Sequence, residues 1–518
     1  MSTQSEDGLV TVEADTESNP QQFYHLRNLV TSPLLRLPAE LIIKIFEHAV
    51  ELDNHNPPSP WEICPALLVL TAVCQELRNI GMTIPLLWGT VDLTTPPLAE
   101  LYLQRCNYDP HILKRFSSNR ESQSLGLIED SRREAVWAQL EGRVFKNLHS
   151  LEFRGMSSEL EQRVVPILRT ATNLSSLELE QPEIFEPQLP WYPTSPLPRF
   201  SVLRLRGFSI SWTSPLLRNL TQLIIILSHG TENSEPPSFE TFLTALANCP
   251  DLKSLKLSRA GLDPLNGYPA QRDVVVQLRK LRELSLYFER ASVTGCVLSH
   301  IRYPESAFLE VGVPAHGDID VSEAISQALP RSNADVLQRF QRTRELTVDL
   351  DPFTSEFSAE KSTISCCHLP TRNSSQRLSR SIRKVLEIVR RDFIALSIEA
   401  QHIDLTGEMW ESFLHGLPRL ERIRWRCKRG KKLDVVDPFV FAFSRPFEGG
   451  VVCPRLTRLD LPKETLDQDQ SAALLKRALT ERNACGVRLE SLGLGNEVTL
   501  AGDRLALEGF LDLVGEVW

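Results

Sequence analysis

The sequence predicts an α/β fold in two parts: a short all-α module near the N-terminus, followed by an irregular leucine-rich-repeat solenoid. Three observations lead to this prediction. The phrase Leu-x-x-Leu-x-Leu recurs through most of the chain, and amphipathic stretches separate its copies. The 518 residues also exceed the roughly 250–300 at which a single core stops growing, which indicates several domains or an elongated repeat array.

The repeated phrase has a direct physical interpretation. Its last two apolar residues lie two positions apart, so they share one face of a short strand. The stretches between copies place apolar residues at helical spacing, as in 239–246. One strand and one helix cannot bury their own core, but stacked units can. The copies, with weaker ones at 309, 346 and 393, are Leu148-Leu151-Phe153, Leu174-Leu177-Leu179, Phe200-Leu203-Leu205, Leu220-Leu223-Ile225, Leu252-Leu255-Leu257, Leu281-Leu284-Leu286, Leu309-Val311, Leu346-Val348, Phe393-Leu396-Ile398, Leu420-Ile423-Trp425, Leu456-Leu459-Leu461 and Leu489-Leu492-Leu494.

Composition divides the chain into three parts. Residues 1–32 are polar and acidic, and we expect a disordered tail there. An apolar helical module follows at 33–93, and the solenoid takes up 94–518. Loop insertions are expected near 181–199, which is Pro-rich, and near 353–381, which is rich in Ser, Thr and Arg. The weak copies leave the number of repeats between 287 and 392 open.

Charge and composition exclude several classes of protein. Hydrophobic residues make up 42% and charged residues 24%, which is ordinary for a soluble globular protein. The formal charge of -9 gives no general attraction for nucleic acid or an anionic membrane. No apolar run approaches the ~18–20 residues of a membrane helix, and the ten cysteines form no regular framework. We therefore expect a soluble intracellular protein, cytoplasmic or nuclear or both, that binds neither nucleic acid nor membrane.

The sequence contains no motif that supports catalysis. It has no phosphate-binding Gly-rich loop, no His-Glu-x-x-His and no Gly-x-Ser-x-Gly. Its one Cys/His cluster, Cys366-Cys367-His368, is an incomplete ligand set for zinc. We therefore predict a binding protein that is not an enzyme and has no cofactor and no metal.

The N-terminal block begins with a clear helix signal at Leu37-Pro38-Ala39-Glu40. Proline suits the first helical turn, and a carboxylate there favours the positive end of the helix dipole. The apolar residues that follow, to Ala49, form one wide face. A second helix is expected from about Pro65 to about Ile80. Pro85-Leu86-Leu87-Trp88 then leads into a strand over Thr90–Leu93.

These residues resemble the F-box family, whose pattern is Leu-Pro-x-Glu, an apolar helix ending in Ile-Phe, a later Val-Cys and a downstream Leu-Trp. The chain departs from the pattern at Leu77, where the family usually has Trp, and at Gln75, where a basic residue is common. Cys-Pro-x-Leu phrases at Cys249 and Cys453 resemble the repeats of fungal-type F-box proteins with leucine-rich repeats. The matching positions are Leu37, Pro38, Glu40, Ile45, Phe46, Val73, Cys74, Leu87 and Trp88.

The resemblance implies a substrate receptor of an SCF-type cullin-RING ubiquitin ligase. In that role the N-terminal module binds a Skp-family adaptor and the solenoid binds an unknown target protein. Two alternatives stay open: the helices could cap the end of the solenoid, and the chain could be a scaffold with no connection to a ligase. The expected adaptor-binding residues are Leu37, Pro38, Leu41, Ile42, Ile45 and Phe46.

One predicted strand carries an unusual row of arginines. Arg422, Arg424 and Arg426 alternate with Ile423 and Trp425, and Arg458 occupies the corresponding position of the next strand. Guanidinium groups at this spacing repel one another unless an anion lies across them. We hypothesise that the four arginines bind an acidic or phosphorylated segment of the target. The alternatives are a solvated face, or neutralisation by nearby carboxylates such as that of Asp460.

Overall fold

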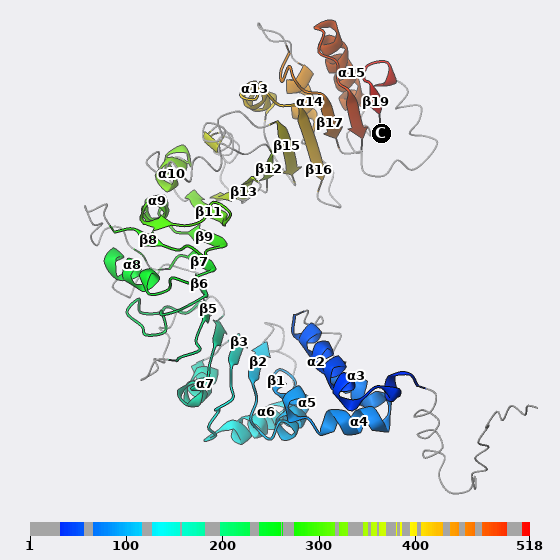
Figure 1. Ribbon diagram of the computed structural model, residues 1–518. Helices are drawn as coiled ribbons and strands as arrows, with labels where there is room; N and C mark the ends of the chain where they lie inside the picture. Colours follow the sequence, from blue (N-terminus) through cyan, green and yellow to red (C-terminus); the bar gives the residue numbers. More distant parts are fainter. Residues whose placement is uncertain are drawn as a thin grey trace, which may run out of the picture. The chain divides into compact units, whose positions relative to one another are not determined.

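The computed structural model divides the chain into two compact units, Met1–Leu174 and Ser175–Trp518 (Figure 1). The unit that contains the predicted 33–93 module thus extends to Leu174. Residues 1–31 of the predicted tail and most of the insertion predicted at 181–199 lie outside the described residues. The structure describes residues 32–55, 66–116, 127–155, 158–181, 197–227, 238–260, 262, 274–315, 321–329, 345–350, 354–359, 362–368, 380, 384–385, 394–400, 406–427, 436–444, 451–461, 469–494 and 510–517.

The first unit opens with a helical module: η1 (Leu34–Arg36), α2 (Ala39–His55), α3 (Ala66–Val73), α4 (Gln75–Met82) and η2 (Pro85–Trp88). As expected, α2 begins directly after Pro38, whose carbonyl accepts the backbone amides of Leu41 and Ile42. The single second helix expected over 65–80 is wrong. Cys74 has an extended backbone, with φ -155° and ψ 168°, and this residue separates α3 from α4. Arg78 Nε of α4 then donates to the Thr71 carbonyl near the end of α3, which fixes the bend.

The helical module has a closed core. Trp88 Nε1 donates to the Gly81 carbonyl at 2.9 Å, and the Trp88 ring meets that of Tyr102 edge-on. A Cβ at Gly81 would lie 2.7 Å from Thr71 Cγ2 and 3.0 Å from the Phe46 ring, so glycine allows the helices to approach closely. The buried apolar side chains of the module are Ile42, Phe46, Leu67, Leu77, Leu87 and Trp88.

The rest of the first unit is α/β. Strands β1 (Thr90–Asp92), β2 (Ile112–Phe116) and β3 (Ser150–Arg154) pair in parallel. Helices α5 (Pro96–Arg105), α6 (Leu127–Leu140) and α7 (Ser158–Thr170) belong to the same unit, and α5 contacts η2, β1 and α6. The strand predicted over 90–93 is confirmed as β1. Helix α5 contacts both this strand and η2, and so joins the helical module to the small sheet.

The second unit is built on an open, largely parallel sheet. Its first six paired strands run in parallel: β4 (Ser176–Glu180), β5 (Val202–Arg206), β6 (Gln222–Ile226), β7 (Ser254–Ser258), β9 (Glu283–Tyr287) and β11 (Phe308–Ala315). A second parallel run comprises β12 (Glu345–Leu350), β15 (Ala395–Ala400), β16 (Arg422–Cys427), β17 (Arg458–Leu461), β18 (Ser491–Leu494) and β19 (Glu516–Val517). Strands β8 (Val276–Gln277) and β10 (Ile301–Arg302) form a separate two-stranded sheet.

An antiparallel hairpin joins the two parallel runs. Strand β14 (Ser362–His368) pairs in parallel with β11 and antiparallel with β13 (Thr354–Ala359), which in turn pairs antiparallel with β12. The residues predicted as a loop insertion near 353–381 therefore contribute two strands to the sheet. The alternation of small polar and apolar residues in 354–368 is compatible with strands, and its Ser and Thr content concealed this in the sequence.

The leucine-rich solenoid predicted from the repeats is wrong: the second unit is α/β with an open sheet. A solenoid needs equal units that follow one another by the same rotation, so that neighbours in sequence are neighbours in the sheet. Here β11 is followed in the sheet by β14, and the β13–β14 hairpin reverses direction. Among the described residues, no helix separates β4 from β5 or β5 from β6. The leucine phrases predict individual strands, but they do not define a regular repeating unit.

One face of this sheet is covered by helices. They are α8 (Phe239–Ala247), α9 (Ala291–His300), α10 (Val321–Ala328), α13 (Gly407–His415), α14 (Val436–Ser444) and α15 (Asp469–Ala484). Helix α9 packs on α10, and α14 packs between α13 and α15. The Trp425 ring of β16 contacts the rings of Trp410 on α13 and Phe439 on α14. Residues that alternate with the buried ones therefore lie on the opposite face of the strands. No helix in the described part of the chain is long and apolar enough to cross a membrane.

Candidate binding surfaces

Helix α2 and the residue before it present a stripe of exposed apolar side chains. Leu37, Leu41 and Ile45 follow one another at intervals of four residues, so they lie along one side of the helix. Their exposed fractions are 36%, 45% and 39%, and Pro38 beside them is also exposed. This side of α2 is the first candidate binding surface.

The other two predicted adaptor-binding residues lie on the inner side of the same helix. Ile42 and Phe46 are 2% and 1% exposed and belong to the core of the module. They can shape a docking surface only by holding α2 in place, because a partner cannot reach them. The structure thus brings Leu37, Pro38, Leu41 and Ile45 together on the outside and separates them from Ile42 and Phe46.

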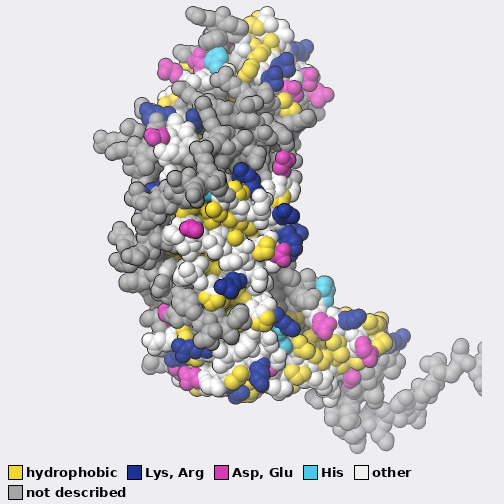
Figure 2. Space-filling view, turned by 60° about the vertical axis from the view of Figure 1, so that its left-hand side comes forward, with side chains coloured by type: hydrophobic (Ala, Val, Ile, Leu, Met, Phe, Trp, Pro, Cys, Tyr) yellow, Lys and Arg dark blue, Asp and Glu magenta, His cyan; other side chains and the backbone are white. Residues whose placement is uncertain are grey.

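Sequence reasoning missed three further exposed apolar residues of the module. Val69 and Val73 lie four residues apart on α3, and Leu86 lies on η2, with exposed fractions of 47%, 64% and 70%. The signal was present, because 66–73 is apolar at more positions than one inward helix face can use. Hydrophobic side chains are prominent on these N-terminal helices in Figure 2.

Both departures from the family pattern fall on α4. Leu77, where the family usually has Trp, is 1% exposed and fills the core of the module. Gln75 is exposed at the first position of α4. Leu77 therefore belongs to the interior of the module and is not part of the exposed side of α2.

The second candidate surface is on β16 and β17, on the face that the helices leave uncovered. In the register of the sheet, Arg422 lies opposite Arg458, and Arg424 lies opposite Asp460. These four residues, Arg422, Arg424, Arg458 and Asp460, are called the arginine square below. Arg426 belongs to β16, but its side chain lies outside the described residues.

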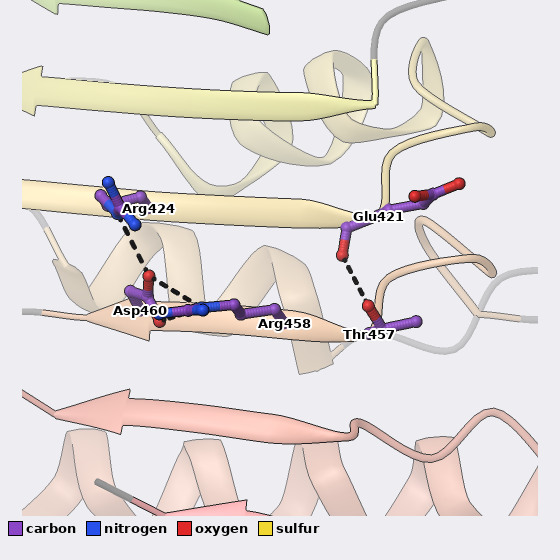
Figure 3. Close-up of polar contacts among 5 residues, drawn as sticks. All are labelled: Glu421, Arg424, Thr457, Arg458 and Asp460. Atoms are coloured by element: carbon purple, nitrogen blue, oxygen red, sulfur yellow. Dashed lines mark hydrogen bonds and ion pairs between the residues drawn. The ribbon is translucent and has the colours of Figure 1, made fainter. Parts of the chain in front are cut away.

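Asp460 organises the arginine square. Its carboxylate accepts a hydrogen bond from Arg424 Nε at 3.2 Å and another from Arg458 Nε at 3.1 Å (Figure 3). The Asp460 side chain is 12% exposed, whereas that of Arg424 is 46% exposed. The carboxylate thus lies beneath the guanidinium groups and holds two of them by their Nε atoms. The neutralisation by Asp460 that the sequence suggested is present for Arg424 and Arg458, whereas the structure describes no ion pair between Asp460 and Arg422.

The charges on the first parallel run of the sheet are arranged differently. Arg204 of β5 forms an ion pair with Glu178 of β4 at 2.9 Å, and Lys256 of β7 forms one with Glu283 of β9 at 2.6 Å. Both of these cations pair with a carboxylate of a neighbouring strand, whereas the structure describes no such ion pair for Arg422 of β16.

The structure contains a close cysteine–histidine pair on α9, but its chemistry is not that of a nucleophile. Cys296 Sγ lies 3.9 Å from His300 Nδ1, which also lies 2.9 Å from the Cys296 carbonyl. Burial raises the pKa of the Cys296 thiol to about 12, which disfavours the reactive thiolate. In the part of the chain that the structure describes, no three His, Cys, Asp or Glu side chains are grouped so that they could hold a metal ion.

No protein-family model matches the chain. A search of curated proteins likewise finds no significant match.

Proposed function

We propose that the chain is the substrate-recognition subunit of an SCF-type ubiquitin ligase. The N-terminal helical module docks a Skp-family adaptor, and the sheet of the second unit binds the target protein. The observation that carries the proposal is the exposed stripe Leu37–Leu41–Ile45 on a module whose core is already closed. The sequence of the module, with its Leu-Pro-x-Glu start and Leu-Trp end, resembles the family that uses these helices for adaptor docking.

The stripe suits a protein partner because its apolar side chains are not needed to complete the core of the module. Burying one such side chain fully contributes about 1.5–3 kcal/mol, and each of the three is already partly covered. Val69, Val73 and Leu86 are exposed on the same module, so its exposed large apolar side chains are several and not single scattered residues. Such a concentration is typical of an interaction surface. A helical adaptor with an apolar groove would cover them and leave Glu40 and Lys44 at the edge in water.

The competing proposal is a scaffold protein without a ligase role, whose N-terminal helices only cap the small β1–β3 sheet of the first unit. Its supporting observation is the packing of η2 on α5, with the Trp88 and Tyr102 rings 5.0 Å apart. This packing uses the inner side of the module, while the stripe on α2 faces outward. Capping and docking therefore use different sides of the helices and are compatible.

Co-expression with a Skp-family adaptor tests the proposal. The full chain should co-purify with the adaptor at one-to-one stoichiometry, and the variant Leu41→Asp/Ile45→Asp should not. Both positions are exposed, so the charges should abolish the contact without unfolding the module. Val144→Asp is the matched control, because Val144 is an exposed valine (61%) elsewhere in the same unit.

Either of two results would remove the ligase proposal. One is a well-folded wild-type chain that does not bind the adaptor. The other is adaptor binding that the double variant retains. The scaffold proposal would then be preferred.

A further inference from the structure

We propose that the arginine square binds a phosphate monoester, carried on a serine or threonine of the partner segment that lies across β16 and β17. This inference deepens the proposed function, because the partner segment would belong to the target protein. It does not depend on adaptor docking, which uses the other compact unit of the chain.

The three arginines of the square lie close enough together to share one ligand. Neighbouring strands lie about 4.8 Å apart, and alternate residues of a strand lie about 6.6 Å apart. Arg422, Arg424 and Arg458 occupy three corners of such a square, and Asp460 occupies the fourth. The three side chains share one face of the sheet, so their guanidinium groups can reach a single compact anion.

Asp460 holds two of the guanidinium groups in place. It accepts from the Nε atoms of Arg424 and Arg458, which restrains both side chains. For Arg424, the structure describes no contact of the two terminal nitrogens, Nη1 and Nη2, and Arg422 has no described side-chain contact. A phosphate has three oxygens that accept such N–H groups, often two from one guanidinium.

The charge of the arginine square favours a phosphate over a carboxylate. A phosphorylated side chain carries roughly -1.5 to -2 at neutral pH, whereas a single carboxylate carries -1. Three arginines around one aspartate favour the more highly charged group.

The one-to-one ion pairs on β4–β9 provide the internal comparison. Arg204 lies on the same sheet and is exposed to a similar degree, with 41% of its side chain accessible, but Glu178 already neutralises it. The proposal therefore predicts that phosphate binding depends on β16 and β17 and does not depend on β5.

The test uses the purified full chain and fluorescein-labelled peptide pools. Each pool has degenerate positions around one fixed central residue, which is phosphoserine, phosphothreonine, serine or glutamate. Fluorescence anisotropy should show binding of the phosphorylated pools and at least roughly tenfold weaker binding of the serine and glutamate pools. Added salt should weaken the binding, because the contact is ionic.

Variants identify the site. Arg422→Gln/Arg424→Gln should weaken binding of the phosphorylated pools roughly tenfold or more, and Arg204→Gln should leave it unchanged. The single variant Arg422→Gln changes an exposed side chain without a described intramolecular contact, so its melting temperature should match that of the wild type while binding weakens. Equal binding of wild type and Arg422→Gln would overturn the proposal, and so would equal binding of the phosphoserine and glutamate pools or no binding of either phosphorylated pool. None of these outcomes affects adaptor co-purification, so the two proposals fail separately.

Discussion

The two sides of helix α2 should respond very differently to truncation. Phe46 is 1% exposed, so Phe46→Ala removes a buried ring and leaves a cavity, at a cost of about 3–5 kcal/mol. Leu41 is 45% exposed on the opposite side of the same helix. Leu41→Ala loses only part of a burial free energy of about 1.5–3 kcal/mol, so its expected cost is about 1 kcal/mol or less.

Hydrogen exchange of the full chain measures this difference locally, which matters because a protein with two compact units need not unfold in one step. The amides of α4, which packs against α2, report on the opening of the helical module. With about 1.4 kcal/mol per factor of ten, Phe46→Ala should speed their exchange at least roughly a hundredfold, and Leu41→Ala at most about fivefold. Exchange in β7 of the second unit should not change.

Equal acceleration by the two substitutions would refute this reasoning. It would mean that Leu41 supports the module as Phe46 does and that the stripe on α2 is not available to a partner.

Three further predictions concern the interior. Gly81→Val should lower the melting temperature of the first unit, because the new side chain has no room between the helices. Mass spectrometry after alkylation at pH 8 should find exposed Cys485 modified and buried Cys453 unmodified. Burial raises the pKa of the Cys453 thiol from 9.0 to about 12. The contribution of the protonated Cys453 thiol to the stability of the fold is therefore present below pH 9 and is lost as the pH rises to about 12. Arg482→Ala should lower the melting temperature of the second unit, because it removes the donor to two buried carbonyls, at about 1–3 kcal/mol each; an unchanged melting temperature would contradict this role.

The individual strands could be predicted from the sequence. Pairs such as Leu203 with Leu205 and Leu255 with Leu257 are buried, and the residues between them are more exposed, as the period of two requires. The start of α2 was predicted for the same kind of reason, because proline and glutamate act on the first helical turn locally. Local rules were sufficient where neighbours in sequence determine the geometry.

The order of strands in the sheet could not be predicted. The pairing of β11 with β14 joins segments that β12 and β13 separate in the chain, and nothing in the leucine spacing specifies it. The break at Cys74 was missed because the apolar periodicity continues across it, from Leu67 to Leu77. Both features depend on tertiary contacts rather than on propensity.

The candidate surfaces were predicted in part. The sequence identified the row of arginines and named Asp460 as a possible partner, and the structure adds that one carboxylate holds two of them. For α2 the sequence predicted one wide apolar face, whereas the structure divides it into an exposed side and a buried side. A wide apolar face can include both an exposed side and a buried side. The packing of α3 and α4 against α2 determines which residues are buried.

Calorimetric titration of the purified chain with a Skp-family adaptor measures whether the exposed side of α2 docks that adaptor. We expect a one-to-one complex with a negative heat-capacity change, because apolar surface is buried on binding. The titration should fail with Leu41→Asp/Ile45→Asp and be unchanged with Val144→Asp. No complex with a folded wild-type chain, or equal affinity for the double variant, would contradict the claim that the exposed side of α2 is an adaptor-docking surface.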